Sequence, residues 1–125
     1  MLANSLVTPT LPAIDLKRAR SFYEDKLGLK AVQSSEQDVT YQAGAGTNIY
    51  VWQREPTSAT DHTETVFAVQ DIEEEVKDLK AKGVKFESYD MPGLRTDEND
   101  IAASDGARAA WFKDTEGNVL GLVQM

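Results

Sequence analysis

Among the few side chains that could support catalysis, Glu64 has the most favourable position. It stands directly before a predicted strand, where a carboxylate buried in a cavity could act as a general base or bind a cation. His62 lies two residues earlier, and alternate residues of a strand share a face, so a slip in register could bring His62 inward instead. The competing interpretations are an exposed Glu64 at the end of a linker and a solvated His62, and for His62 we expect the solvated position.

A second group of candidates is aromatic. Tyr50 and Trp52 alternate along one predicted strand and therefore share a face, where they could form a wall that stacks on a flat or cationic molecule. The same rings could equally fill a core. Trp111 and Phe112 point to opposite faces of another strand, so at least one of them is structural. Met91 could close a cavity from a neighbouring loop, which makes Trp111 and Met91 further ligand-binding candidates.

Composition excludes several kinds of site. The chain has no cysteine, which rules out disulfides, thiolate metal sites and cysteine nucleophiles, and its single histidine rules out a histidine-rich centre. Its 13 basic and 21 acidic residues give a net charge of −8, which argues against nucleic acid and favours cationic over anionic ligands. No apolar run has the length of a membrane span, and the start does not resemble a signal peptide. We expect a cytoplasmic protein that binds no membrane and holds no cofactor.

Two segments about 56 residues apart share a helix-start pattern. They are residues 15–29 and 71–84. Asp15 is a good N-cap for the first helix, and Asp71 with Glu74 forms a capping box for the second. In both segments, apolar residues at helical spacing form one stripe. The sequence therefore predicts two amphipathic helices at corresponding places.

Strand patterns precede and follow each helix. The predicted strands are residues 6–14, 29–35, 39–43 and 48–53 in the first half, and 65–69, 84–88, 107–113 and 119–124 in the second. The order gives module one (1–53), a linker (54–63) and module two (64–125). Residues 46–53 align with 117–124, so the second half has 15 additional residues, about the length of loop 89–106. Such a loop could be a lid or a loose surface segment.

This order of elements resembles the vicinal oxygen chelate superfamily, which includes glyoxalase I, extradiol dioxygenases, and bleomycin- and fosfomycin-resistance proteins. The resemblance covers the whole chain. It rests on residues 15–23 with 27–29, on 67–72, and on 111–122. It implies an α+β fold in which two tandem βαβββ modules form a curved mixed sheet around a cavity, and it implies a homodimer.

In metal-dependent members of that superfamily, each module supplies one ligand on its first strand and one on its last. The corresponding positions here are Thr8 and Glu64 on the first strands, and Tyr50 and Gly121 on the last. Of these, Glu64 is the one plausible ligand, and His62 would raise the number to two. A catalytic divalent ion usually needs three or four protein donors. We therefore expect the fold without the metal.

The sequence predicts a glyoxalase- or bleomycin-resistance-like protein that binds a small aromatic or cationic molecule. A metal-dependent lyase, isomerase or dioxygenase of the same superfamily is the alternative, as is a metal-free epimerase with Glu64 as its catalytic base. A dimerisation or auxiliary module is a third interpretation. The expected ligand-binding residues are Thr8, Tyr50, Trp52, Glu64, Met91 and Trp111.

Overall fold

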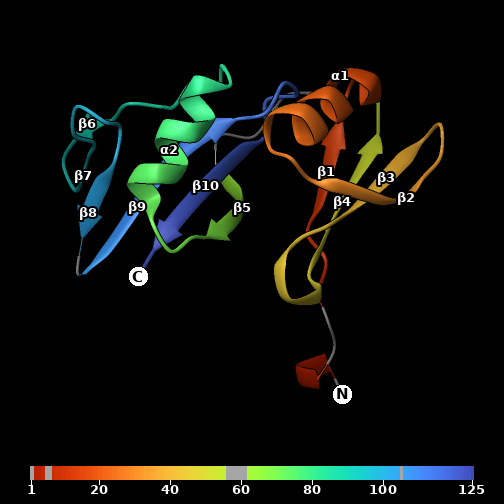
Figure 1. Ribbon diagram of the computed structural model, residues 1–125, viewed down its shortest axis with the longest axis horizontal. Coiled ribbons are helices and arrows are strands. Elements are labelled where there is room, and N and C mark those ends of the chain that lie inside the picture. Colours follow the sequence, from red (N-terminus) through yellow and green to blue (C-terminus); the bar gives the residue numbers. More distant parts are fainter. Residues whose placement is uncertain (1, 5–6, 56–61, 105) are drawn as a thin grey trace. The chain divides into compact units, whose positions relative to one another are not determined.

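The computed structural model describes residues 2–4, 7–55, 62–104 and 106–125, and the chain divides into two compact units, 1–58 and 59–125 (Figure 1). In these described ranges, each unit combines one α-helix with a four-stranded mixed sheet. In each sheet the first strand of the unit is an edge strand that pairs in parallel with the last, while the other pairs are antiparallel. The predicted α+β fold of two βαβββ modules is confirmed.

In unit one, residues 1–58, the strands have the order β1-β4-β3-β2. A short 3-10 turn, η1 (Leu2–Asn4), precedes them. The remaining elements are β1 (Thr10–Ala13), α1 (Leu16–Ser21), the π-helical turn η2 (Phe22–Lys26), β2 (Lys30–Ser34), β3 (Asp38–Gln42), the 3-10 turn η3 (Gly44–Gly46) and β4 (Asn48–Gln53).

The core of unit one forms where α1 and η2 pack against one face of the sheet. Alternate residues of β1, β3 and β4 are buried, as expected for strands with one covered face. The rings of Tyr23 and Tyr41 stack with centroids 5.7 Å apart. The principal core residues are Leu11, Ala13, Leu16, Ala19, Phe22, Tyr23, Val39, Tyr41, Ile49 and Val51.

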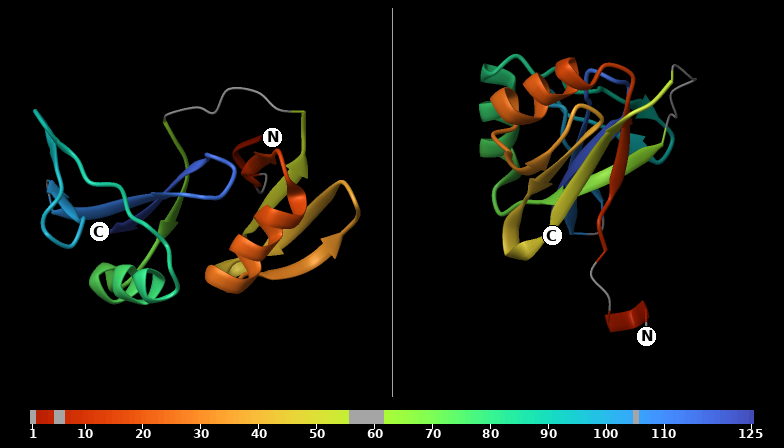
Figure 2. Two further views of the ribbon diagram at one scale, coloured as in Figure 1. Left: turned by 90° about the horizontal axis from the view of Figure 1, so that it is seen from above. Right: turned by 90° about the vertical axis from the view of Figure 1, so that its right-hand side faces the viewer.

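In unit two, residues 59–125, the strands have the order β5-β10-β9-β8, with a separate two-stranded hairpin. Figure 2 shows α2 along one side of this sheet. The elements are β5 (Thr63–Ala68), α2 (Ile72–Ala81), the hairpin strands β6 (Asp90–Met91) and β7 (Leu94–Arg95), β8 (Ala102–Ser104), β9 (Ala107–Lys113) and β10 (Val119–Gln124). The core residues include Ile72, Val76, Leu79, Val84, Phe86, Ile101, Phe112, Leu120 and Leu122.

The two α-helices begin with the same pair of hydrogen-bonding devices. Asp15 and Asp71 are N-caps, and each accepts a hydrogen bond from the backbone N–H three residues later, at 3.1 and 3.2 Å. In addition, Gln53 at the end of β4 and Gln124 at the end of β10 accept from the first N–H of α1 and α2, at 2.9 and 2.8 Å. Each glutamine therefore ties the last strand of its unit to the start of its helix.

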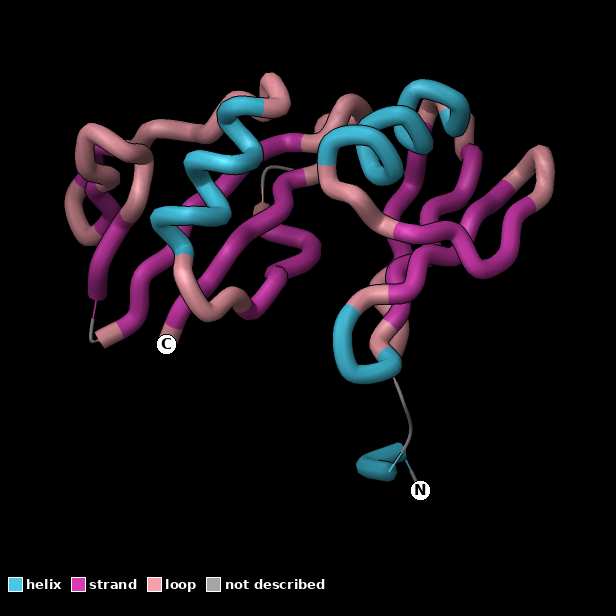
Figure 3. The backbone as a smooth tube through the Cα atoms, viewed as in Figure 1, coloured by secondary structure: helices cyan, strands magenta, loops and turns pink. Residues whose placement is uncertain are grey.

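The clearest departure from the predicted elements is in unit two. Residues 84–88 form one isolated bridge, between Phe86 and Phe112, and no strand. Val84 and Phe86 are both buried, so the alternating apolar pattern of this segment reflects burial in the core. It does not reflect a continuous hydrogen-bonded strand. The strand beside β9 is β8, within the expected loop 89–106, where Figure 3 also shows β6 and β7. Its Ala-Ala-Ser sequence has little β propensity, which is why the pattern missed it.

Other boundaries differ by a few residues. The first predicted strand, 6–14, begins only at Thr10, because Pro9 cannot donate to a ladder; Leu6 lies outside the described residues. The first helix ends as η2 at Lys26, before Gly28 with its φ of +72°. β5 begins at Thr63, inside the predicted linker, of which residues 56–61 lie outside the described part. No described helix has the length and apolarity needed to cross a membrane.

Candidate functional site

The strand pairing reproduces the internal alignment of the two modules. In unit one, Thr10 of β1 lies beside Tyr50 of β4, and in unit two Val66 of β5 lies beside Gly121 of β10. The positions on the first strands are 56 residues apart in sequence and those on the last strands 71, as the sequence alignment requires. Tyr50 and Gly121 therefore occupy corresponding places in their sheets.

Both positions lie on the sheet face that points away from the α-helix of the same unit, which we call the helix-distal face. The alternate residues of the strands are buried under the helix, so the others belong to this face. In unit one it is formed by Thr10, Pro12, Asp38, Thr40, Asn48, Tyr50 and Trp52. In unit two it is formed by Val66, Ala68, Ala109, Trp111, Gly121 and Val123.

A tyrosine–carboxylate pair is the main polar feature of the helix-distal face of unit one. The hydroxyl of Tyr50 donates to Oδ2 of Asp38 at 2.5 Å, and the Ser35 hydroxyl donates to Oδ1 at 2.8 Å. These hydrogen bonds, the first above all, lower the pKa of the Asp38 carboxyl below its ordinary value. The bond to Asp38 raises the pKa of Tyr50, with smaller contributions from burial and charge. At neutral pH the face carries a fixed carboxylate beside a neutral phenol.

Trp52 follows Tyr50 on this face and already has a cation over its ring. The guanidinium carbon of Arg54 lies 5.6 Å from the centroid of the indole, a cation–π distance. Asp38 is the cross-strand partner of Trp52. Asp38 and Arg54 were not among the sequence candidates. Because Arg54 continues the alternation of Tyr50 and Trp52, the sequence could have indicated that Arg54 lies on the same face. Predicting Asp38 there would have required the register between β3 and β4.

In unit two, Trp111 fills the space at Gly121. A Cβ added at Gly121 would lie 3.4 Å from Cδ1 of Trp111 and 3.5 Å from Cγ2 of Val66, so the indole lies against the strand. The ring of Tyr89 meets Trp111 edge to face, with centroids 5.5 Å apart. Burial, and then the charge of Glu87, raise the pKa of Tyr89. Phe112 is fully buried on the other face, so it is the structural member of the pair.

The other sequence candidates lie at less enclosed positions. Thr8 is exposed and precedes β1. Glu64 is half-buried in β5, at a register shift where Thr63 and Thr65 face consecutive residues of β10, and such a bulge redirects a side chain. His62 is exposed before β5. Met91 is 47% exposed in the hairpin of β6 and β7.

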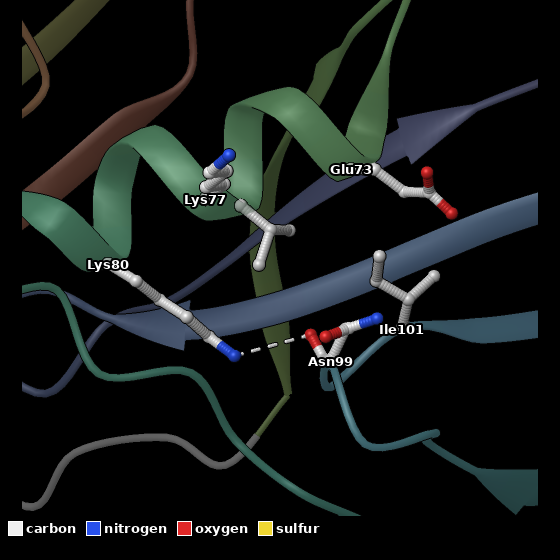
Figure 4. A pocket seen from close by; sticks show the side chains of 6 residues that line it. Glu73, Lys77, Lys80, Asn99 and Ile101 are labelled. Carbon is white, nitrogen blue, oxygen red and sulfur yellow. Dashed lines mark hydrogen bonds between the residues drawn. The ribbon is translucent and has the colours of Figure 1, made fainter.

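A pocket of about 320 Å³ lies beside α2 in unit two, and none of the sequence candidates lines it (Figure 4). Two of its charged side chains, Lys80 and Glu73, already have partners. Lys80 pairs with Asp100 at 2.9 Å and donates to the carbonyl of Asn99 at 3.4 Å, while Glu73 pairs with Arg108 at 2.7 Å. Its lining residues are Glu73, Val76, Lys77, Lys80, Asn99 and Ile101.

Comparison with known families agrees with this architecture. The sequence matches the model of the Glyoxalase/Bleomycin resistance protein/Dioxygenase superfamily over residues 5–122. The chain belongs to this superfamily. The predicted resemblance is therefore confirmed. A comparison with curated proteins finds no significant match.

Solved structures with the same fold come from several members of the glyoxalase superfamily. Lactoylglutathione lyase from Agrobacterium tumefaciens has a TM-score of 0.73 at 18% identity, covering 97% of this chain and 93% of the other. The fosfomycin resistance protein FosX from Listeria monocytogenes has a TM-score of 0.73 at 17% identity, covering 98% of this chain and 93% of the other. The antibiotic binding protein TnmS3 from a Streptomyces species has a TM-score of 0.70 at 22% identity, covering 99% of this chain and 98% of the other. At these identities the likeness shows the fold alone.

The four positions that the resemblance assigns to metal ligands carry few side-chain donors for a divalent cation. Gly121 offers no side-chain donor, and Trp111 lies where a longer side chain would have to pass. The Tyr50 hydroxyl is committed to Asp38. Thr8 supplies a neutral hydroxyl, which leaves Glu64 as the one good ligand. Within the described ranges, no group of three or more His, Asp or Glu side chains gathers as a metal site would require.

Proposed function

We propose that this glyoxalase-superfamily protein binds a small aromatic molecule without a metal ion, through the helix-distal faces of its sheets. The observation that carries the proposal is the arrangement on unit one: two half-buried aromatic side chains, Tyr50 and Trp52, beside a hydrogen-bonded carboxylate, Asp38. Aromatic rings provide a large apolar contact area, and fixed polar groups at the edge orient a ligand. Trp111 offers a second aromatic surface on unit two.

Two further observations support this function. The four positions that correspond to metal ligands offer one good donor, Glu64. A catalytic divalent ion usually needs three or four protein donors, so these side chains favour a function without a metal ion. In addition, TnmS3, which has the same fold, is an antibiotic binding protein, so this fold serves binding as well as lyase activity. We include Glu64 as a ligand contact and, at the exposed margins, Thr8 and Met91. The Asp38 carboxylate would favour an aromatic ligand that also carries a positive charge.

The first test is a thermal-shift panel containing bleomycin, a tetrapyrrole and small naphthyl compounds, since a ligand that binds only the folded state raises Tm. The chain has two tryptophans, so Trp111→Phe leaves Trp52 as the only indole and Trp52→Phe leaves Trp111. Quenching in one variant identifies the face that binds. Tyr50→Ala should abolish binding, and the matched Tyr50→Phe, which keeps the ring, should preserve most of it.

If no compound raises Tm, and Tyr50→Ala and Trp52→Ala only destabilise the protein, the aromatic face is core and the proposal is wrong. The metal-dependent alternative has its own measurement, elemental analysis and native mass spectrometry of untagged protein. Nickel, iron or manganese near one equivalent per chain would favour a lyase, isomerase or dioxygenase. We also propose a cytoplasmic homodimer, for which light scattering should give twice the chain mass.

A further inference from the structure

The row of side chains on β4 continues beyond the strand into a cationic residue. Tyr50, Trp52 and Arg54 alternate along the chain, and the backbone N–H of Arg54 donates to the carbonyl of Ala13 at 2.9 Å, which keeps residue 54 in line with the sheet. The half-buried side chain of Arg54 turns back over the Trp52 ring, with its guanidinium carbon 5.6 Å from the ring centroid. The backbone is thus fixed, and a cation–π contact holds the guanidinium near the indole.

Among the described residues, no group accepts a hydrogen bond from this guanidinium. Within the described residues, Arg54 donates no side-chain hydrogen bond and forms no ion pair. By contrast, Arg20, Arg95 and Arg108 each pair with a carboxylate. Asp38, the carboxylate on the same face, accepts from Tyr50 and Ser35 instead. The hydrogen bonds of Asp38 therefore go to Tyr50 and Ser35, and within the described part of the chain they do not involve Arg54.

A guanidinium that lies over an aromatic ring, with no donor engaged among the described residues, has a specific chemistry. Its paired N–H groups match the two oxygens of a carboxylate. The cation lies over one face of the Trp52 indole, so a ligand that approaches this face meets the cation. The aromatic part of such a ligand then contacts the ring of Tyr50, which lies beside Trp52 on the same sheet face.

We infer that the Arg54–Trp52 cation–π pair is an oxyanion receptor, and that the ligand of this face is a planar aromatic molecule carrying a carboxylate. The inference rests on the proposed function and narrows its ligand class. A single carboxylate suits the site better than a phosphate, because Asp38 and the net charge of −8 oppose a dianion. This assignment runs against the preference for cations that the net charge and Asp38 favour. The hydrogen bonds from Tyr50 and Ser35 offset part of the Asp38 charge, and salt screens the more distant charges, so the guanidinium beside Trp52 decides the preference.

Three naphthyl probes of similar size test the charge preference by isothermal titration calorimetry on the full chain. They are 2-naphthoate, its neutral isostere 2-naphthamide, and 2-naphthylmethylammonium. We expect 2-naphthoate to bind at least about tenfold more tightly than the amide, the usual value of a charge-assisted hydrogen bond. Arg54→Gln should remove this preference by weakening naphthoate binding far more than amide binding, and Arg54→Lys should keep part of it. Arg95→Gln, which changes net charge equally in unit two, should have no effect.

The alternative outcomes are distinguishable. Equal binding of naphthoate and naphthamide, unaffected by Arg54→Gln, overturns the oxyanion receptor and leaves the aromatic-binding function standing. Tightest binding by the ammonium probe, improved by Arg54→Gln, also overturns it, because Arg54 would then occupy the place of a ligand cation. Absence of binding by all three probes, together with no thermal shift from the wider panel, overturns both proposals.

Discussion

Tyr41→Phe should destabilise unit one by about 1–2 kcal/mol at neutral pH. Tyr41 is fully buried, and its hydroxyl donates at 2.8 Å to Oε2 of Glu24, which also accepts from Nε of Arg20 at 2.6 Å. A hydrogen bond to a charged group contributes about 1.5–3 kcal/mol. The lower part of this range applies, because Glu24 keeps Arg20 and its side chain, 31% exposed, can bind water in place of the hydroxyl.

This loss should depend on pH. The hydrogen bond from Arg20, and then that from Tyr41, lower the pKa of Glu24 below its ordinary value of 4.5. A carboxylate with a lowered pKa contributes stability that is fully present above its unfolded-state pKa and disappears as pH falls through the folded-state value. The effect of Tyr41→Phe should therefore be constant from pH 7 to about pH 5 and shrink below about pH 4.5.

The assay is urea unfolding followed by Trp52 fluorescence in a Trp111→Phe background, so that unit one alone is observed. Tyr50→Phe is the matched control, because it removes another tyrosine–carboxylate bond of the same unit from a more exposed site. It should cost less than Tyr41→Phe. A loss from Tyr41→Phe no larger than that of the control, or one that stays constant down to pH 3, would refute the reasoning.

Three further substitutions test local interactions within one unit or the other. Gln124→Ala removes the 2.8 Å bond to the first N–H of α2 and should lower the free energy of unfolding of unit two by about 1 kcal/mol in urea titrations followed at Trp111. Ala45→Gly should raise stability by about 0.5–1 kcal/mol, because Ala45 has a φ of +56°, whereas Ala43→Gly at an extended position should lower it. Gly121→Ala should fall within about 0.5 kcal/mol of wild type, since the added methyl meets Trp111 at 3.4 Å, but Gly121→Leu should displace the indole and shift its emission.

The sequence predicted best the elements whose residues combine β-branched or aromatic character with a turn at one end. The bounds of β4, β9 and β10 match the predicted strands 48–53, 107–113 and 119–124. The turn before β10 is also as expected, because Asp114 accepts from the backbone N–H groups of Glu116 and Asn118. The weak strand β8 was not predictable, because its place depends on pairing with β9 rather than on its own residues.

The candidate site was predictable in part, for a related reason. Alternation along one strand is enough to place Tyr50 and Trp52 on a common face. The approach of Asp38 to Tyr50 requires the register between β3 and β4, which no local pattern contains. The position of Glu24 under Tyr41 depends on the wide π-helical turn η2, a rare geometry that the regular helix pattern did not indicate.

The bond between Gln124 and the start of α2 also bears on how unit two could be used as a scaffold. It closes the framework of β5, α2 and β10 without any contribution from the hairpin of β6 and β7. The entropy of closing a loop grows only slowly with its length, so added residues at the hairpin tip would cost little. A foreign peptide grafted between Pro92 and Gly93 should therefore be displayed on a unit that remains folded, which makes this hairpin a practical site for engineering new recognition loops.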